Sequence, residues 1–186
     1  MQRSEQLVDS DCHSTEHAEV IRFREQPVCL RALRAGDRAL IEDLVGRTEP
    51  YDLQMRFFAG FRRLPATLLD HLMRIDPERR VTLVASSARS NGRGEILAVA
   101  RAHLSAERGA EIALLVRSDL KGMGLGSLLL GKLIARCRRR GLKFLTGDVL
   151  QQNARMLRLA DRYGFRREEA APDTIRLVLD LEPLAA

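Results

Sequence analysis

Short apolar runs alternate along the chain with longer segments in which apolar residues recur every three or four positions. The short runs predict seven strands, over residues 28–32, 81–85, 96–104, 110–116, 144–150, 165–169 and 174–181. The periodic segments predict four helices, which lie between Gly36 and Pro50, Pro65 and Asp76, Gly126 and Gly141, and Asn153 and Gly164. The order of these elements predicts an α/β domain without internal repeats.

The first 27 residues differ from the rest of the chain. They carry three arginines and six acidic residues, a net charge of −3, whereas the whole chain carries +6. They are polar, lack a sustained period and end at Pro27. We therefore predict an N-terminal tail over residues 1–27, ordered in part at Val20–Phe23, and a folded domain over residues 28–186.

Composition narrows the classes of function. The chain has 186 residues, of which 45% are hydrophobic and 30% charged, as in ordinary globular domains. Aromatic residues make up only 4% and tryptophan is absent, which argues against base-stacking platforms for nucleic acid. A net charge of +6 favours an anionic ligand or partner. We expect no membrane partner, because no apolar run approaches the roughly 20 residues that cross a bilayer.

The cysteines and histidines give no support for a disulfide framework or a metal site. The three cysteines are an odd number without a CxxC pair, which favours a reducing compartment. His13 and His17 lie four residues apart beside Cys12, but a fourth ligand and a helix signal are missing, so we expect no metal. With no apolar signal segment at the N-terminus, the expected location is the cytoplasm.

A glycine-rich turn lies between the strand predicted at residues 110–116 and the longest predicted helix. Its glycines follow a G-x-G-x-G pattern, which is neither that of a P-loop nor that of a dinucleotide fold. Glycines let main-chain N–H groups approach a ligand, and the first turn of a helix has free N–H groups and a positive dipole end. The sequence therefore predicts a phosphate site, here called the phosphate turn, formed by Lys121, Gly122, Met123, Gly124, Leu125, Gly126 and Ser127.

Two segments resemble the signatures of the GCN5-related N-acetyltransferase (GNAT) superfamily. The stretch from Lys121 to Gly126 resembles its [Q/R]-x-x-G-x-[G/A] turn, with lysine in place of glutamine or arginine. The stretch from Asn153 to Phe165 resembles a second signature, N-x-x-A-x-x-L-Y-x-x-x-G-F, in spacing. Across residues 30–181 the chain is most similar to the acetyltransferase domain of bacterial protein lysine acetyltransferases, through residues 55–58, 115–126 and 147–150.

This resemblance implies the GNAT fold, a mixed central sheet of about seven strands flanked by about four helices, with acetyl-CoA as co-substrate. The phosphate turn would hold the diphosphate, and the main chain of Leu115, Val116 and Arg117 would pair with the pantetheine amides. Asn153 would contact the pantetheine or cap its helix. The implied acceptor is a protein with an exposed lysine, an acyl-CoA synthetase being one candidate. We expect neither the synthetase-like module nor the cyclic-nucleotide sensor that such enzymes often carry, because 186 residues leave no room for either.

Acetyl transfer needs a base, because a free lysine amine is almost entirely protonated at neutral pH. Glu111 is the expected base for direct attack, since it begins the strand that leads into the phosphate turn. The protein acetyltransferases that the chain resembles also have a glutamate at the matching strand position. Asp148 and His103 are alternatives, although the aspartate could serve a hydrogen bond and the histidine is more typical of a packed core residue. Cys137 lies among apolar helix residues and is expected to be packed rather than nucleophilic.

No general acid is predicted for the leaving thiolate. Many members of the superfamily have a tyrosine at the position of Ala160. Tyr163 lies three residues later, about 60° away around the helix, and is not a simple replacement. We therefore expect solvent to protonate the thiolate.

The distribution of charge bears on the acceptor. Residues 127–147 hold six basic and no acidic residues, which is typical of a solvated helix face and also suits the adenosine phosphate of CoA. Residues 51–63 hold one acid, Asp52, and three arginines, Arg56, Arg62 and Arg63. This balance favours an acidic protein surface around a target lysine over a small cationic amine. A small-amine acetyltransferase and a non-catalytic acyl-CoA-binding regulatory module remain the alternatives.

Overall fold

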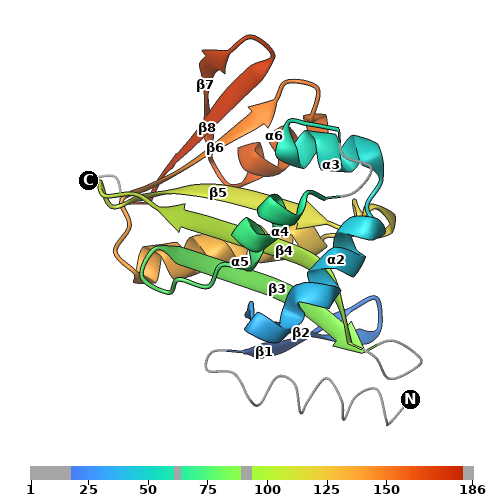
Figure 1. The fold of residues 1–186 in the computed structure, drawn as a ribbon. Helices are drawn as coiled ribbons and strands as arrows, with labels where there is room; N and C mark the ends of the chain where they lie inside the picture. Colours follow the sequence, from blue (N-terminus) through green and yellow to red (C-terminus); the bar gives the residue numbers. More distant parts are fainter. Residues whose placement is uncertain (1–17, 61–63, 89–93, 182–186) are drawn as a thin grey trace.

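A single mixed sheet organises the chain in the computed structural model, which describes residues 18–60, 64–88 and 94–181. Its strands follow the order β1-β2-β3-β4-β5-β6-β8-β7 (Figure 1). All neighbouring pairs are antiparallel except β5 and β6, which are parallel. The strands are β1 (Glu19–Phe23), β2 (Gln26–Ala32), β3 (Arg80–Ala88), β4 (Gly94–Leu104), β5 (Gly109–Val116), β6 (Phe144–Leu150), β7 (Arg166–Ala171) and β8 (Thr174–Asp180).

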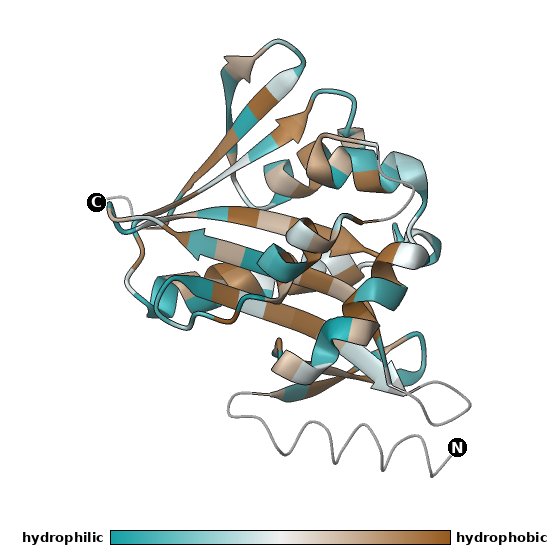
Figure 2. Ribbon diagram, viewed as in Figure 1, coloured by the Kyte–Doolittle hydropathy of each residue, from teal (hydrophilic) through white to brown (hydrophobic). Residues whose placement is uncertain are grey.

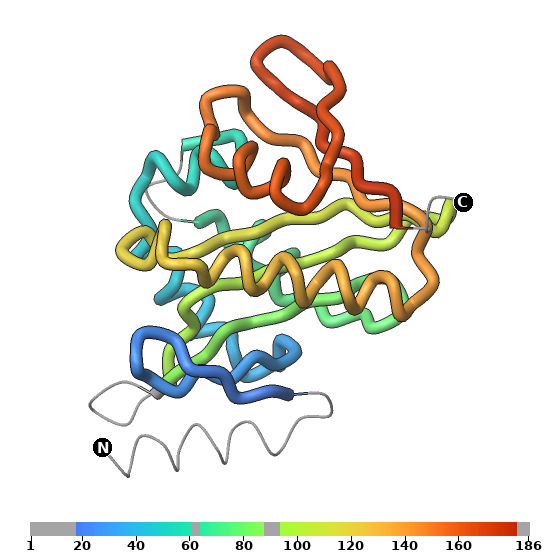
Figure 3. The backbone as a smooth tube through the Cα atoms, turned by 180° about the vertical axis from the view of Figure 1, so that it is seen from behind, coloured from blue at the N-terminus to red at the C-terminus, as the bar shows by residue number. Residues whose placement is uncertain are grey.

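Helices cover both faces of this sheet. α5 crosses β3, β4 and β5 on the face seen in Figure 3, with α6 beside it. α2, α3 and α4 lie on the face seen in Figure 1. The helices are α2 (Arg38–Gly46), α3 (Pro50–Phe57), α4 (Ala66–Met73), α5 (Leu125–Arg139) and α6 (Ala154–Arg162), with 3₁₀ turns η1 (Ala35–Asp37) and η2 (Ser118–Leu120).

Two apolar layers hold the helices to the sheet, one on each face. Successive strand side chains point to opposite faces, so Leu83 joins the layer under α5 whereas Val84 joins the layer under α2 and α4. Both are almost fully buried, at 1% and 0% exposed. Apolar residues accordingly dominate the central strands (Figure 2). A strand buried on both faces reads as an unbroken apolar run, which is why the sequence predicts these strands well.

The predicted α/β class and mixed sheet are confirmed, and the described residues form one strand and one helix more than expected. The additional strand, β1, lies inside the segment assigned to a tail, and it pairs with β2 from Glu19 to Phe23. Only two of its side chains, Ile21 and Phe23, pack against the core, too few to form a recognisable pattern. The boundary predicted at residue 27 therefore lies within the sheet, and residues 1–17 lie outside the described part of the chain.

The additional helix, α3, begins at Pro50, where the sequence predicts only a break. Proline is favoured in the first helical turn because the N–H that it lacks has no partner there in any case. α3 packs against β5 and β6. This short helix matters because it brings its side chains to the edge of the candidate site.

The cysteines differ from expectation in one respect. Cys29 in β2 is disulfide-bonded, which the sequence did not predict, whereas Cys137 is free, 0% exposed and packed as expected. Burial raises the pKa of the Cys137 thiol to about 11, so the thiol stays protonated at neutral pH, as suits a packed cysteine. Cys12, His13 and His17 lie outside the described residues. Within the described ranges, no helix is long and apolar enough to cross a membrane, and no group of three potential metal ligands occurs.

A buried ion pair fixes the entry to α2. Both oxygens of Asp37 accept hydrogen bonds from the Arg31 guanidinium, at 2.7 and 2.9 Å, and the main-chain N–H of Arg34 donates to one of them at 2.8 Å. Arg31 is 1% and Asp37 4% exposed. Because neither charge can be hydrated in place, removal of either partner of the pair is costly.

We predict that Asp37→Asn lowers the free energy of unfolding by about 3–5 kcal/mol, because it removes the negative charge that binds the buried Arg31 guanidinium through two hydrogen bonds. Urea unfolding followed by circular dichroism measures the change. Asp70→Asn is the matched control, since the Arg38–Asp70 pair is exposed and is expected to contribute at most about 1 kcal/mol. Equal losses of unfolding free energy in the two variants would contradict a stabilising role for the buried Arg31–Asp37 pair.

Candidate active site

The site is a cavity of about 490 Å³ that opens where β5 and β6 separate. The two strands pair in register only from Gly109–Phe144 to Glu111–Thr146. Beyond that point they diverge (Figure 1), and residues of both strands line the cavity. The remaining wall comes from the phosphate turn, α3 and α6. The β5 edge toward β6 is thus left without a partner strand among the described residues, from residue 112 onward.

The phosphate turn has the form that anion binding requires. Gly124 is the N-cap of α5 and, like Gly122, has a positive φ, at +93° and +78° respectively. A Cβ added at either glycine would meet nothing within 4 Å, so both backbones face open space. No side chain caps α5, which leaves the N–H groups of its first turn available to a ligand. Gly126 differs, since its Cβ would lie 3.3 Å from Val116, and it serves close packing of α5 on β5.

Two polar side chains of the turn have partners within the protein. The Lys121 ammonium lies 2.5 Å from Asp52 Oδ1 on α3. The Tyr163 hydroxyl donates to the Ser127 carbonyl oxygen at 2.5 Å and lies 3.2 Å from the Ser127 hydroxyl. Tyr163 therefore ties α6 to the start of α5 and does not line the cavity. Gly131 provides the room, because a Cβ there would lie 2.8 Å from the tyrosine oxygen.

Most of the predicted cofactor residues line the cavity. They are Leu115, Val116, Lys121, Gly122, Gly124, Gly126, Ser127 and Asn153. Asn153 also caps α6, accepting a hydrogen bond from the Met156 N–H at 3.2 Å. Three predicted residues do not line it: Arg117, Met123 and Leu125. Leu125 is 1% exposed and belongs to the core, and Met123 is 43% exposed.

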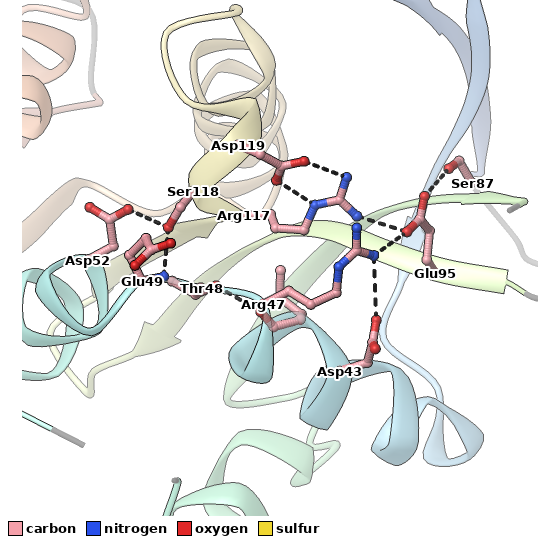
Figure 4. A network of polar contacts seen from close by, with 11 residues as sticks. Asp43, Arg47, Thr48, Glu49, Asp52, Ser87, Glu95, Arg117, Ser118 and Asp119 are labelled. Atoms are coloured by element: carbon pink, nitrogen blue, oxygen red, sulfur yellow. Dashed lines mark hydrogen bonds and ion pairs between the residues drawn. The ribbon is translucent and has the colours of Figure 1, made fainter. Parts of the chain in front are cut away.

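The prediction for Arg117 is wrong, because its main-chain N–H and carbonyl already form hydrogen bonds within the protein. Its N–H donates to the Leu97 carbonyl and its carbonyl accepts from the Leu120 N–H, both at 3.0 Å. Its guanidinium is held by Asp119 and Glu95 (Figure 4). Arg117 therefore fixes the end of β5 and has no free amide for a pantetheine. Strand β5 already ends at the preceding residue, Val116, which the sequence could not show.

Glu111 lies at the branch point of the two strands and lines the cavity. It is the last residue of β5 that pairs with β6, opposite Thr146, and it is opposite His103 on β4. Its side chain is exposed. Two arginines interact with its charge, Arg56 from α3 and Arg176 from β8. Burial lowers the pKa of Arg56 to about 10, and the attraction to Glu111 counteracts part of this, so Arg56 stays charged at neutral pH.

The alternative bases are less suited to the role. Both oxygens of Asp148 accept hydrogen bonds from Arg176, at 2.8 and 2.9 Å. These bonds, more than the accompanying charge interaction, hold the pKa of Asp148 below its usual value, which makes it a weak base. His103 is exposed, not packed in the core as the sequence suggested, and it does not line the cavity. Ala160 is 0% exposed, so that position supplies no acid.

Sequence reasoning missed two groups of cavity residues. The first lies in and directly after α3: Asp52, Met55, Arg56, Phe57 and Phe58. The sequence drew attention to Asp52 and Arg56 by their charge but did not predict the helix that brings them to the cavity. The second comes from α6, where three arginines share one face: Arg155, Arg158 and Arg162. Their spacing of three and four residues was a usable signal, because it places them on the same side of a predicted helix. Arg62 and Arg63, which the charge argument also used, lie outside the described ranges.

Comparison with known proteins identifies the family. A family model described as "Acetyltransferase (GNAT) family" matches residues 47–165, more than half of the chain. The chain belongs to the GNAT acetyltransferase family. As a GNAT acetyltransferase it is an enzyme that uses acetyl-CoA.

Individual GNAT relatives agree with this placement. An acetyltransferase of Pseudomonas aeruginosa is 27% identical over 152 residues, which is 81% of each chain. The crystal structure of the GNAT domain of Streptomyces lividans PAT has a TM-score of 0.78 at 24% identity and covers 88% of this chain and 96% of that one, which shows a common fold. A mutant of a cAMP-binding acyltransferase from Mycobacterium smegmatis has a TM-score of 0.60 at 26% identity. That match covers 98% of this chain and 50% of the mycobacterial protein.

The cavity fits acetyl-CoA on the chemistry of its own groups. The uncapped start of α5, the open glycines and Lys121 suit a diphosphate. The free edge of β5 offers main-chain donors and acceptors to an extended chain with amides, as an added strand would. The arginines of α6 add positive charge along the same wall.

We predict that Gly124→Ala weakens CoA binding and lowers stability by about 1–2 kcal/mol, because an L side chain is strained at a φ of +93°. Calorimetric titration with CoA and thermal unfolding measure the two effects. Gly46→Ala in α2 is the control, since a Cβ there meets nothing within 4 Å and its φ is ordinary. CoA affinity unchanged at Gly124→Ala would contradict the assignment of the turn.

Proposed function

We propose that this GNAT acetyltransferase moves the acetyl group of acetyl-CoA to the side-chain amine of a protein lysine, with Glu111 as the general base. The observation that carries the proposal is the position of Glu111 at the point where β5 and β6 separate. An acceptor amine that reaches this point from the α3 side meets the carboxylate at the inner end of the cavity.

The length of β5 supports this arrangement. Val116 lies five positions after Glu111, and at about 3.3 Å per residue this is roughly 17 Å of strand. The phosphate turn follows beyond Val116, so the diphosphate site and Glu111 lie at opposite ends of the free strand edge. The thioester of acetyl-CoA supplies the activated acetyl group. The chain supplies the track along β5 and a base at its far end.

Removal of the amine proton is the main chemical demand on the protein. A lysine with a pKa of about 10.4 is neutral in only about one molecule in 2,500 at pH 7, a cost of roughly 4.6 kcal/mol. Glu111 is placed to accept this proton. The positive charges of Arg56 and Arg176, which interact with Glu111, also disfavour the ammonium form of an amine bound beside it. No tyrosine lines the described cavity, so solvent protonates the leaving thiolate.

The charges of the cavity favour a protein lysine over a small polyamine. A small cationic amine needs several free carboxylates, but Asp52 is paired with Lys121 and Asp148 with Arg176. Glu111 is then the one carboxylate of the cavity wall without such a partner among the described residues. Tyr51 and Phe58 are 56% and 46% exposed on and beside α3, an apolar surface that suits contact with a macromolecule. The common fold with the PAT domain agrees with this choice.

We predict that Glu111→Gln lowers turnover by about 10²–10⁴-fold while CoA affinity stays within about twofold, because the amide keeps the shape but accepts no proton. A thiol-release assay and calorimetric titration with CoA measure the two quantities. Glu107→Gln is the matched control, since Glu107 lies in the exposed turn between β4 and β5. Full turnover in Glu111→Gln would remove this residue from the catalytic site.

We predict that radiolabelled acetyl-CoA incubated with the enzyme and a bacterial lysate labels protein bands, and that the label resists hydroxylamine as amides do. Label confined to the small-molecule fraction would instead favour the small-amine alternative. Label in neither fraction would favour a non-catalytic acyl-CoA-binding module. Mass spectrometry of the labelled bands then identifies the lysines.

A further inference from the structure

Asp52 connects the acceptor-facing helix α3 to the phosphate turn. Its Oδ1 lies 2.5 Å from the Lys121 ammonium, and its Oδ2 accepts a hydrogen bond from the Ser118 hydroxyl, also at 2.5 Å. The Ser118 hydroxyl in turn accepts from the main-chain N–H of Glu49, at 2.8 Å (Figure 4). The side chains of Asp52 and Lys121 are only 14% and 20% exposed, so water screens their attraction weakly.

α3 carries this connection to the other end of the cavity. Asp52 and Arg56 are four residues apart, which places them on the same face of the helix, about 6 Å apart along its axis. Both line the cavity. Asp52 contacts the turn that is proposed to hold the diphosphate, whereas Arg56 interacts with the charge of Glu111. The helix therefore spans the distance from the cofactor phosphates to the proposed base.

The neighbouring polar network does not replace Asp52. In that network Glu95 binds both Arg47, at the end of α2, and Arg117, at 2.7 and 2.8 Å, and Arg117 binds Asp119 (Figure 4). It fastens α2 to the end of β5. The link from α3 to the phosphate turn is instead the ion pair between Asp52 and Lys121.

The Asp52 carboxylate also weakens the attraction of the phosphate turn for the cofactor diphosphate. An ammonium already paired with Asp52 attracts a diphosphate less than a free one, and the aspartate charge itself repels phosphate oxygens. A residue that only strengthened cofactor binding would not carry a negative charge at this place. The position of Asp52 is explained if its role is to hold α3 in place.

We propose that Asp52 is a positioning residue that holds α3, and with it Arg56, in register with Glu111 by binding Lys121 and Ser118 of the segment leading into the phosphate turn. It does so at a loss of affinity for the diphosphate. The inference rests on the proposed function, because it assigns Asp52 to the acceptor side of that reaction. If the proposal holds, removing the charge of Asp52 raises CoA affinity and lowers turnover.

The test compares Asp52→Asn with the wild-type protein in calorimetric titrations with CoA and with pantetheine, which lacks the diphosphate. We expect CoA affinity to rise about fivefold at low ionic strength and this gain to shrink with added salt. Pantetheine affinity should stay unchanged. Turnover at saturating acetyl-CoA, on a capped peptide with one lysine between glutamates, should fall about tenfold because α3 loses its anchor. Asp70→Asn on α4 is the control for net charge and should change neither quantity.

A second variant keeps the proposal testable if Asp52→Asn folds poorly in thermal unfolding. Ser118→Ala leaves the Asp52–Lys121 pair in place and removes only the hydroxyl link, so turnover should fall while CoA affinity stays the same. Weaker CoA binding together with slower turnover in Asp52→Asn would indicate a general structural loss and overturn the proposal, as would unchanged turnover. A wild-type protein that binds CoA but does not acetylate the peptide would instead count against the proposed acceptor, and the titrations would still decide on Asp52.

Discussion

The functional architecture depends on the separation of two parallel strands. β5 and β6 share three residue pairs and then part, and the cavity opens at that divergence. Beyond these pairs the edge of β5 has no partner strand within residues 18–60, 64–88 and 94–181, which suits a ligand with amides along an extended arm. The divergence begins immediately after Glu111, so the residue with the right chemistry lies where the two strands part. Gly147 marks the same point on β6, where a Cβ would lie 3.2 Å from Ile112.

The outer end of the cavity is defined by backbone conformation rather than by side chains. Gly122 and Gly124 adopt conformations that L residues avoid, and the start of α5 has no side-chain cap. A helix end without a cap is unfavourable in isolation, because its N–H groups lack partners. At this position the missing partners are what an anionic ligand provides. Just before this turn, Asp119 and Glu95 bind the Arg117 guanidinium and fix the end of β5.

Pairing of charges decides which cavity residues are chemically free. Arg176 holds Asp148 and Lys121 holds Asp52, so two of the three carboxylates on the wall are neutralised by cations. Glu111 faces arginines that interact with it only at longer range. In the proposed reaction, Glu111 is then the carboxylate left to act as the base, and positive charge surrounds the incoming amine. Both effects favour the neutral amine that nucleophilic attack requires.

The sequence determined the apolar strands and the amphipathic helix α5, because these follow from local periodicity. It also predicted a phosphate turn and a candidate base from residue types at fixed spacing. It could not determine that β1 joins the sheet, since two inward-facing residues form no pattern, or that Pro50 begins a helix rather than ending one. Only the tertiary structure decided that the main-chain and side-chain groups of Arg117 are hydrogen-bonded within the protein, and that Asp148 is paired with Arg176. It alone brought Asp52 to Lys121, which lies 69 residues further along the chain. These facts depend on contacts between distant segments, and such contacts are set by how the whole sheet and its helices pack, which no local pattern records.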